Sequence, residues 1–241
     1  MIFKNSGDNM TANDLKPPSF ITTAKELLTP LELARLVAAT ATLTKQPRGN
    51  GEPVMVLPGL GTSDVSTLIM RKYLSWLGYD VRGWNLGRNN GNVGDLLPQV
   101  TEQINRHYAR TNARTNLIGW SLGGVLAREI ARDKPKLIRQ IITLGSPVVG
   151  GPKYTTFGRL YKSRGANLDA IEARIAARES RPIRVPITAI YSKRDGIVGW
   201  QASIDKLNPQ TEHIEVKATH LGLGISPDVF KVLAKKLAST L

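Results

Sequence analysis

The spacing of apolar positions changes near residue 50. Between residues 23 and 44 the leucines recur near helical spacing, at positions 27, 28, 31, 36 and 43. From Glu52 onward, short apolar runs alternate with segments of helix length. The pattern predicts an N-terminal extension over residues 1–50, with an irregular start and one packing helix, followed by a main domain over residues 51–241.

The main domain is predicted to alternate strands and helices. The expected strands are residues 53–57, 79–84, 116–120, 137–144, 187–191 and 213–218. The expected helices are 66–77, 95–110, 122–132 and 227–237, with Asp95 capping the second of them. Strands joined by helix-length connections pair in parallel and carry helices on both faces. The pattern therefore predicts an α/β fold with a doubly wound, mostly parallel sheet.

One segment interrupts this alternation. Residues 148–184 separate two core strands by more chain than a connection usually needs. Within the segment, Leu168, Ile171 and Ile175 lie at helical spacing, which predicts a short amphipathic helix. We interpret residues 148–184 as a helical lid over the strand ends, and a plain long crossover helix is the alternative.

The composition narrows the classes of protein. The chain contains no cysteine, which excludes disulfides and thiolate chemistry. The longest apolar stretch, residues 27–43, is interrupted by Glu32 and Arg35 and is too polar to span a bilayer. Residues 1–10 hold one lysine and no apolar core, so no secretory signal is expected. We therefore expect a soluble, cytoplasmic protein.

The charge is strongly basic, with 33 Lys and Arg against 19 Asp and Glu and a formal net charge of +14. Such a chain can attract nucleic acid, an anionic membrane or an acidic substrate. The cations are spread along the chain without a basic helix or interleaved aromatics, so no specific nucleic-acid partner is expected. Weak association with an anionic membrane surface stays open. For residues 23–44 a lipid-facing helix is less favoured than a packing helix, because its polar face carries few cations.

A strand-to-helix boundary carries the first candidate for catalysis. Residues 119–123 read Gly-Trp-Ser-Leu-Gly, between an apolar strand and a helix rich in Val, Leu and Ala. Gly119 and Gly123 supply small groups at a sharp turn, which would lift the hydroxyl of Ser121 clear of the sheet. The alternative is a helix N-cap. The context favours Ser121 as a nucleophile.

A serine nucleophile needs a base, and the chain has three histidines. His107 falls inside a predicted helix and is expected at the surface. His213 is expected on the outer face of its strand, because Ile214 and its alternating neighbours face inward. His220 follows that strand at its C-terminal end, where catalytic groups gather in open α/β sheets. His220 is therefore the expected base.

The third member of a triad is a carboxylate that orients the histidine, expected between serine and histidine in sequence. The candidates are Asp133, Asp169, Asp195 and Asp205. Asp195 is favoured because it follows the strand 187–191 within four residues, next to Gly196, which would permit a tight turn. Asp205 is second. Asp133 and Asp169 fall on predicted helices and are more simply surface charges.

The oxyanion of an acyl-transfer intermediate needs two hydrogen-bond donors. The backbone N–H of Leu122, the residue after the candidate nucleophile, is the first. The second is assigned to the backbone N–H of Leu60, in the turn Pro58-Gly59-Leu60-Gly61 that follows the first strand.

The order Ser121, Asp195, His220, the strand–Gly-x-Ser-x-Gly–helix context and the early Pro-Gly-Leu-Gly turn resemble the α/β-hydrolase superfamily over residues 52–237. Within it the chain is most similar to bacterial esterases and lipases. The Leu-Gly-Ser-Pro turn at residues 144–147 is similar to one in many lipid-active members. The resemblance implies acyl transfer through Ser121, and it argues against the superfamily's dehalogenases, which use an aspartate there.

The chain departs from the superfamily's pattern at one point. Lipase-like members often have His-Gly at the oxyanion turn, where this chain has Pro58-Gly59. The backbone donor is kept, while the subfamily is left open.

Three functions follow, in order of preference. The first is a serine hydrolase that cleaves a small-molecule or lipid carboxylic ester through an acyl-enzyme. The second is an acyl thioesterase or acyltransferase with the same nucleophile, and the third is a binding module without catalysis. No cofactor is expected: three scattered histidines offer no metal-ligand pair, and Gly59-x-Gly61 does not continue into a dinucleotide-binding motif.

Overall fold

The computed structural model describes residues 15–163 and 165–239. Residues 1–14 lie outside the described residues. The expected lack of a secretory signal and most of the expected irregular start of the chain concern these residues. No helix of the described ranges is both long enough and apolar enough to cross a bilayer.

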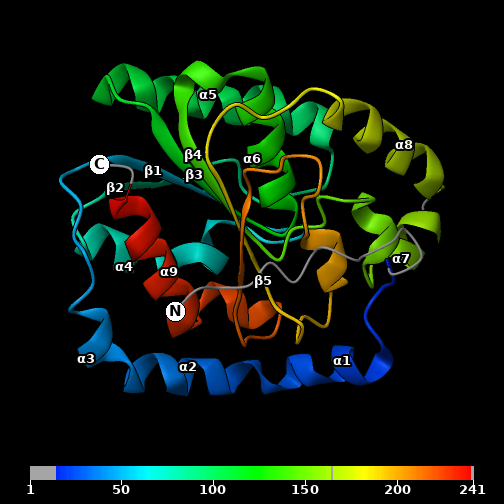
Figure 1. Ribbon diagram of the computed structural model, residues 1–241, viewed down its shortest axis with the longest axis horizontal. Helices are drawn as coiled ribbons and strands as arrows, with labels where there is room; N and C mark the ends of the chain where they lie inside the picture. The colour runs from blue at the N-terminus through cyan, green and yellow to red at the C-terminus, as the bar shows by residue number, and fades with distance from the viewer. Residues whose placement is uncertain (1–14, 164, 240–241) are drawn as a thin grey trace.

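The described residues form a six-stranded sheet in the order β2-β1-β3-β4-β5-β6 (Figure 1). All the pairings in this sheet are parallel. The strands are β1 (Pro53–Leu57), β2 (Asp80–Gly83), β3 (Thr115–Trp120), β4 (Ile138–Leu144), β5 (Ile187–Tyr191) and β6 (Glu212–Glu215). The predicted strands are confirmed in type and order. The last one ends at Glu215 because its neighbour β5 ends at Tyr191, with which Glu215 is paired.

Helices cover both faces of the sheet, as the alternation predicts. They are α4 (Leu68–Trp76), preceded by the 3-10 turn η3 (Asp64–Thr67), α5 (Val93–Thr111), α6 (Leu122–Asp133) and α9 (Pro227–Ala238). One apolar core forms between the sheet and α5 and α6, and it includes Ile104 and Ile130. A second core forms on the opposite face against α4 and α9, around Met70 and Phe230. Further 3-10 turns are η4 (Pro135–Leu137), η6 (Trp200–Ser203) and η7 (Leu221–Gly224).

Two local predictions on α5 were wrong. The helix is capped by Asn92, whose side chain accepts a hydrogen bond from the backbone N–H of Asp95, so Asp95 lies in the first turn and is not the cap. His107 is 4% exposed, and its Nε2 lies 3.0 Å from Oδ2 of Asp80. The cause is the helical repeat, because His107 continues the buried stripe that includes Val100 and Ile104. Burial lowers the pKa of His107 by more than Asp80 raises it.

The N-terminal extension is a broken helical rod along one edge of the molecule, at the bottom of Figure 1. It consists of α1 (Phe20–Ala24), η2 (Lys25–Leu28), α2 (Thr29–Ala38) and α3 (Thr40–Leu43). The predicted helical stretch is thus present in pieces. It lies against α9 and the loops that follow β5 and β6.

The long segment between β4 and β5 forms η5 (Gly151–Tyr154), α7 (Gly158–Ser163) and α8 (Leu168–Glu179), on the right of Figure 1. Helix α8 is the amphipathic helix expected there, with Leu168 buried. The start of the segment is joined to the loop after β5 by a bridge between Thr155 and Val198.

Candidate active site

The candidate site lies between β1 and β3, where the order of strands in the sheet reverses. Strand β1 pairs with β2 on one side and with β3 on the other, so the loops that leave β1 and β3 diverge at their C-terminal ends. Parallel sheets bind ligands at such switch points. The turn with Leu60 follows β1, and Ser121 directly follows β3. The topology therefore brings the two predicted parts of the site together.

Ser121 adopts a strained backbone conformation, with φ 54° and ψ −120°. Few side chains other than glycine tolerate a positive φ, and such strain collects at functional sites. The turn is fixed by hydrogen bonds from Ser121 N to Leu144 O at 2.8 Å and from Gly124 N to Ser121 O at 3.0 Å. Ser121 occupies the N-cap position of α6, but its side chain makes no capping hydrogen bond. The capping alternative is therefore not what the hydroxyl does here.

The glycines of the turn are required by close packing. A Cβ on Gly119 would overlap the backbone of Gly124, and one on Gly123 would overlap the carbonyl group of Leu57. Because glycine has no Cβ, the first turn of α6 can lie against β1 and β3.

The turn after β1 lies against Ser121. A Cβ on Gly59 would lie 3.3 Å from the Cβ of Ser121. Leu60 and Leu122 both line the cavity at Ser121, and the backbone N–H of neither donates a hydrogen bond within the described residues. The two N–H groups are thus free to serve as the proposed oxyanion donors.

The sequence reasoning did not identify Asn89, which holds this turn. Asn89 is fully buried, and its Nδ2 donates to the carbonyl oxygen of Pro58 at 2.9 Å. Its backbone accepts from Gly61 N and donates to Thr62 O, each at 2.8 Å. An asparagine in a loop of mixed polar residues carries no sequence signal for this role, because the residues of the turn that it binds are 27 to 31 positions away.

Asp195 and His220 are in direct contact. Asp195 Oδ2 lies 2.6 Å from Nδ1 of His220, and both side chains are buried. Asp195 Oδ1 accepts from the backbone N–H groups of Ile197 at 2.9 Å and Val198 at 2.7 Å. The carboxylate is thus fixed on one oxygen by its own loop and presents the other to the imidazole, as an orienting carboxylate does.

The electrostatics of His220 favour its charged form. Burial lowers the pKa of His220, but the carboxylates of Asp195 and then of Glu26 outweigh burial, so the pKa lies above its usual value. The ring centroid of His220 lies 6.3 Å from that of Trp120, the residue before Ser121. No hydrogen bond joins Ser121 Oγ to His220 within the described part of the chain. Contacts of this kind often tighten only when substrate binds.

Two glycines make room around this pair. Gly145, at φ +52°, leaves space where a Cβ would lie 2.8 Å from Asp195 Oδ2 and 3.1 Å from His220 Nδ1. Gly196 was expected to permit a tight turn, but its φ is not in the left-handed region. Instead, the lack of a Cβ at Gly196 leaves room for the N-terminal extension, because a Cβ there would lie 2.5 Å from the carbonyl oxygen of Thr22.

Glu26 of the extension joins the two loops, a contact that the sequence did not reveal. Its Oε1 accepts from the backbone N–H of Gly196 at 2.8 Å and of His220 at 2.7 Å. Its Oε2 accepts from the backbone N–H of Leu221 at 2.9 Å. One carboxylate therefore ties the residue after Asp195 to His220 itself.

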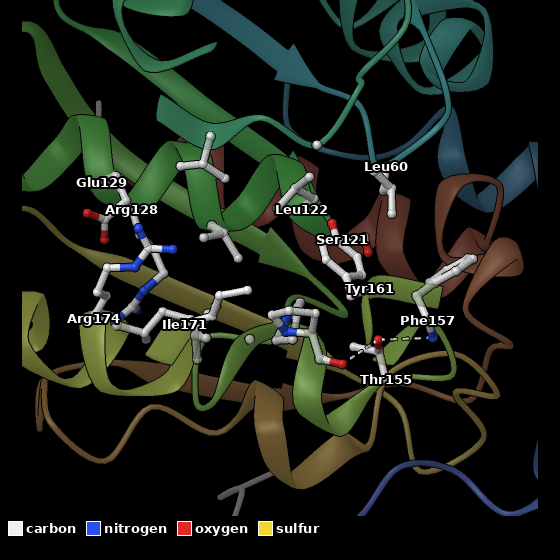
Figure 2. A pocket seen from close by; sticks show the side chains of 18 of the residues that line it. Leu60, Ser121, Leu122, Arg128, Glu129, Thr155, Phe157, Tyr161, Ile171 and Arg174 are labelled. Atoms are coloured by element: carbon white, nitrogen blue, oxygen red, sulfur yellow. Dashed lines mark hydrogen bonds between the residues drawn. The ribbon is translucent and has the colours of Figure 1, made fainter. Parts of the chain in front are cut away.

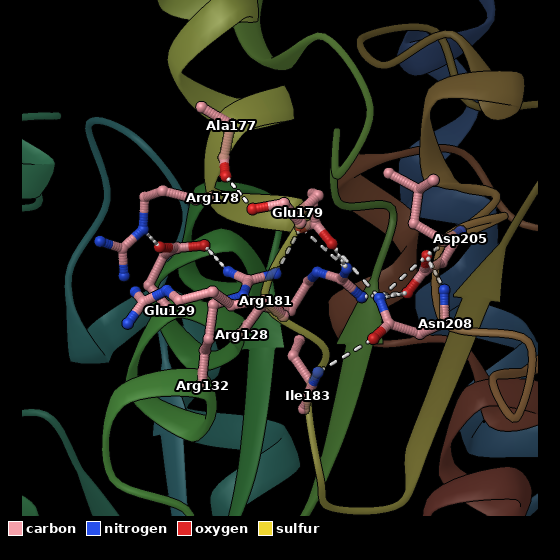
Figure 3. Close-up of polar contacts among 12 residues, drawn as sticks. Arg128, Glu129, Arg132, Ala177, Arg178, Glu179, Arg181, Ile183, Asp205 and Asn208 are labelled. Carbon is pink, nitrogen blue, oxygen red and sulfur yellow. Dashed lines mark hydrogen bonds and ion pairs between the residues drawn. The ribbon is translucent and has the colours of Figure 1, made fainter.

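The other acidic candidates lie elsewhere. Asp205 is buried in an ionic cluster with Arg128 and Asn208 (Figure 3). Its backbone N–H donates to Nε2 of His213, so this histidine is half-buried and packed inward, and not on the outer face as expected. Asp133 pairs with arginines at the surface, and Asp169 pairs with a lysine there, in keeping with their expected roles.

A cavity of about 470 Å³ opens at Ser121, within the size range of small-molecule sites. Figure 2 shows Leu60, Leu122 and Tyr161 around Ser121, with Ile171 and Arg174 of α8 toward the other end. Most lining side chains are apolar, and the segment 148–184 contributes a large share of them. The cavity can therefore hold an apolar chain beside the serine.

No protein-family model matches this sequence, and no curated protein matches it either. Solved structures match its fold. A structure from work on the metagenome-derived lipolytic enzymes LipS and LipT has 16% identity and a TM-score of 0.63, covering 81% of this chain and 95% of that one. The monoacylglycerol lipase of Paleococcus ferrophilus has 17% identity and a TM-score of 0.59, covering 79% and 97%.

A third similar structure is the thioesterase domain from the curacin biosynthetic pathway, with 16% identity and a TM-score of 0.53, covering 80% of this chain and 93% of that domain. At these identities the likeness is one of fold. The protein has the α/β-hydrolase fold, and the expected fold class is confirmed.

Proposed function

We propose that this protein is a serine hydrolase that cleaves carboxylic esters in the manner of esterases and lipases. The observation that carries the proposal is the buried 2.6 Å contact between Asp195 and His220, beside the strained turn of Ser121 and its apolar cavity. The similar folds of lipolytic enzymes support the same reaction class.

In the proposed reaction, Ser121 Oγ attacks the acyl carbon and its proton passes to Nε2 of His220. Nδ1–H of His220 donates to Asp195, whose negative charge stabilises the imidazolium that forms. The tetrahedral intermediate then collapses, the ester C–O bond breaks, and the alcohol leaves with the proton from Nε2. Water, deprotonated by His220, hydrolyses the acyl-enzyme and restores Ser121.

The oxyanion of each tetrahedral intermediate would be stabilised by the backbone N–H groups of Leu60 and Leu122. Loss of one such donor typically costs roughly 100- to 1000-fold in rate. Because Asn89 fixes the turn that carries Leu60, it would contribute to catalysis without touching the substrate.

The proposal predicts that Ser121→Ala abolishes hydrolysis of a p-nitrophenyl ester, with kcat lower by about a millionfold, because no other hydroxyl can replace the nucleophile. Steady-state kinetics on the folded variant measure this. Ser163→Ala, which removes an exposed hydroxyl from α7, is the matched control and should keep full activity. A fluorophosphonate probe should label Ser121 in the native protein. Unchanged turnover in Ser121→Ala would assign catalysis to another residue, and failure of the probe to label a native protein that shows no turnover would leave only a binding role for the fold.

A thioesterase or acyltransferase is the second candidate, and Arg174 favours it. This arginine lines the cavity, is exposed, and has no ion pair among residues 15–163 and 165–239. Together with the +14 charge, it could receive a phosphate group of an acyl thioester. A panel of p-nitrophenyl esters and acyl thioesters of graded chain length separates the candidates. A higher kcat/KM for thioesters at matched chain length would favour the second.

A further inference from the structure

The N-terminal rod exposes its apolar face. Along residues 20–38 the outward positions follow one another at intervals of three or four, as one face of a helix does. They are Phe20, Ala24, Leu27, Leu31, Ala34 and Ala38, and all are exposed. Phe20 is 87% exposed and Leu27 is 84% exposed. Ile21 and Leu28 widen the same face, at 70% and 51%.

On the opposite side of residues 20–32, Thr23, Glu26 and Thr29 face the body of the protein. Thr23 Oγ1 donates to the carbonyl oxygen of Gly196 at 2.8 Å, and the hydroxyls of Thr29 and Thr219 lie 2.8 Å apart. Glu26 accepts three backbone hydrogen bonds from the loops of the candidate triad. This is the reverse of an ordinary surface helix, which buries its apolar stripe and turns polar groups to water.

Polar contacts of this kind hold the rod in one orientation, so the apolar face cannot turn inward without breaking them. A continuous exposed apolar face on a folded protein usually marks a binding surface. The expectation of a simple packing helix is therefore incomplete. Over residues 20–32 the rod packs on the main domain through polar side chains, and its C-terminal part packs there through Leu36, Ala39 and Leu43.

The charges around the face select its partner. Lys16, Lys25, Lys45 and Arg48 are exposed along and beyond the rod. Between residues 15 and 50 the acidic residues are Glu26 and Glu32, and both are directed inward. Glu32 is 7% exposed and paired with Arg35. The outer face is thus apolar with a cationic margin and no exposed acid within these residues.

We propose that the outer face of residues 20–38 is a docking surface for an anionic lipid bilayer. Apolar side chains would enter the interface between headgroups and acyl chains, while the lysines contact lipid phosphates. A second copy of the chain fits less well. A two-fold pairing of the rods would place cationic ends against cationic ends, whether the rods run parallel or antiparallel.

The experiment is co-sedimentation of the purified protein with vesicles of phosphatidylcholine, pure or mixed with phosphatidylglycerol. The expected result is binding to the mixed vesicles that weakens as salt is raised. The variant Leu27→Ser/Leu31→Ser should bind at least about tenfold more weakly, because each buried leucine contributes substantially to partitioning. The matched control is Val65→Ser/Leu207→Ser, which removes two exposed apolar side chains outside the rod and should bind normally.

A charge pair of variants completes the test. Lys16→Glu/Lys25→Glu and Lys134→Glu/Lys136→Glu each lower the formal net charge of +14 by four. Only the variant in the rod, Lys16→Glu/Lys25→Glu, should weaken binding to the mixed vesicles strongly. If both lysine variants lost binding equally and Leu27→Ser/Leu31→Ser had no effect, net charge alone would explain the attraction to the vesicles, and the proposal would be overturned. Sedimentation velocity without lipid tests the alternative occupant. A dimer of the unmodified protein that becomes a monomer in Leu27→Ser/Leu31→Ser would assign the face to a second copy and would also overturn the proposal. Since Ser121→Ala should bind vesicles normally, this test is independent of the proposed activity.

Discussion

Glu26 connects two backbone segments that come together only in the folded chain. Its carboxylate accepts hydrogen bonds from Gly196, His220 and Leu221. Burial lowers the pKa of His220, while Asp195 and, to a smaller extent, Glu26 raise it. We therefore regard Glu26 as a positioning residue for the candidate base, acting on both its place and its charge.

The variant Glu26→Gln is expected to lower kcat with little change in KM. The amide nitrogen of glutamine cannot accept the hydrogen bonds of the replaced oxygen, so the loops of Asp195 and His220 would lose part of their alignment. The pH profile gives a second readout. The proposed mechanism requires neutral His220, so activity should rise with pH through the pKa of His220, which lies above its usual value. Removing the charge of Glu26 lowers this pKa and moves the acid limb to lower pH.

The control for this prediction is Glu102→Gln, which removes an exposed carboxylate from α5. It should change neither kcat nor the pH profile. If Glu26→Gln lowered stability alone, with the acid limb in its original place, the role of Glu26 would be structural only.

Helices α6 and α8 are joined by a buried ionic cluster (Figure 3). Arg128 of α6 lies 2.6 Å from Asp205 and 3.0 Å from Glu179 at the end of α8, and all three side chains are buried. Burial raises the pKa of Asp205, but Arg128 and then Asn208 outweigh burial, so the pKa lies below its usual value. The cluster fixes the C-terminal end of α8, and its members Arg128 and Glu179 line the cavity together with further residues of α8.

Replacing the arginine of this cluster should destabilise the fold. Arg128→Met leaves the buried carboxylate of Asp205 without its cation, while Glu179 keeps its ion pair with Arg132. Loss of one partner of a buried ion pair typically costs about 3–5 kcal/mol in the free energy of unfolding. Urea denaturation measures the loss. Because the native pKa of Asp205 is lowered, the stabilisation is present above about pH 4, the usual pKa of aspartate, and is lost as pH falls through the native pKa.

The matched change is Arg106→Met, which removes an exposed arginine paired with Glu102 on α5. It should alter the free energy of unfolding by less than about 1 kcal/mol. Similar small losses for Arg128→Met and Arg106→Met would mean that the buried cluster contributes no more than a surface pair.

At the scale of the whole molecule, the candidate catalytic loops and the exposed apolar face lie on opposite sides of the same rod. Glu26 contacts the loops from its inner side, and Leu27 and Leu31 face outward. The two proposals together predict an enzyme that works at a lipid surface. The apolar cavity at Ser121 is consistent with acyl chains from such a surface.

This arrangement predicts a split between lipid and soluble substrates. With a lipid ester presented in phosphatidylglycerol vesicles, Leu27→Ser/Leu31→Ser should lower turnover in parallel with the loss of binding, about tenfold or more. Hydrolysis of a soluble p-nitrophenyl ester should stay unchanged, because neither leucine lines the cavity. Equal effects on the two substrates would instead indicate damage to the catalytic loops.

Much of the fold could be predicted from the sequence because its signals are local. Strands of a parallel sheet are buried on both faces, so they read as short apolar runs, and β1 and β5 begin and end where those runs do. The turn at Ser121 is marked by glycines that its own neighbours require. His107 shows the limit of such reading, since its residue type suggested the surface while its position in the repeat of α5 placed it in the core.

The sequence by itself determined the α/β alternation and the sharp turn at Ser121, because these depend on residues a few positions apart. The order of the candidate triad along the chain is likewise a property of the sequence alone. Only the tertiary structure decided that Asp195 and not Asp205 contacts His220, and that Asn89 and Glu26 hold the surrounding loops. It also decided which face of the N-terminal rod is exposed. These outcomes depend on hydrogen bonds between residues up to 195 positions apart, which no local pattern encodes.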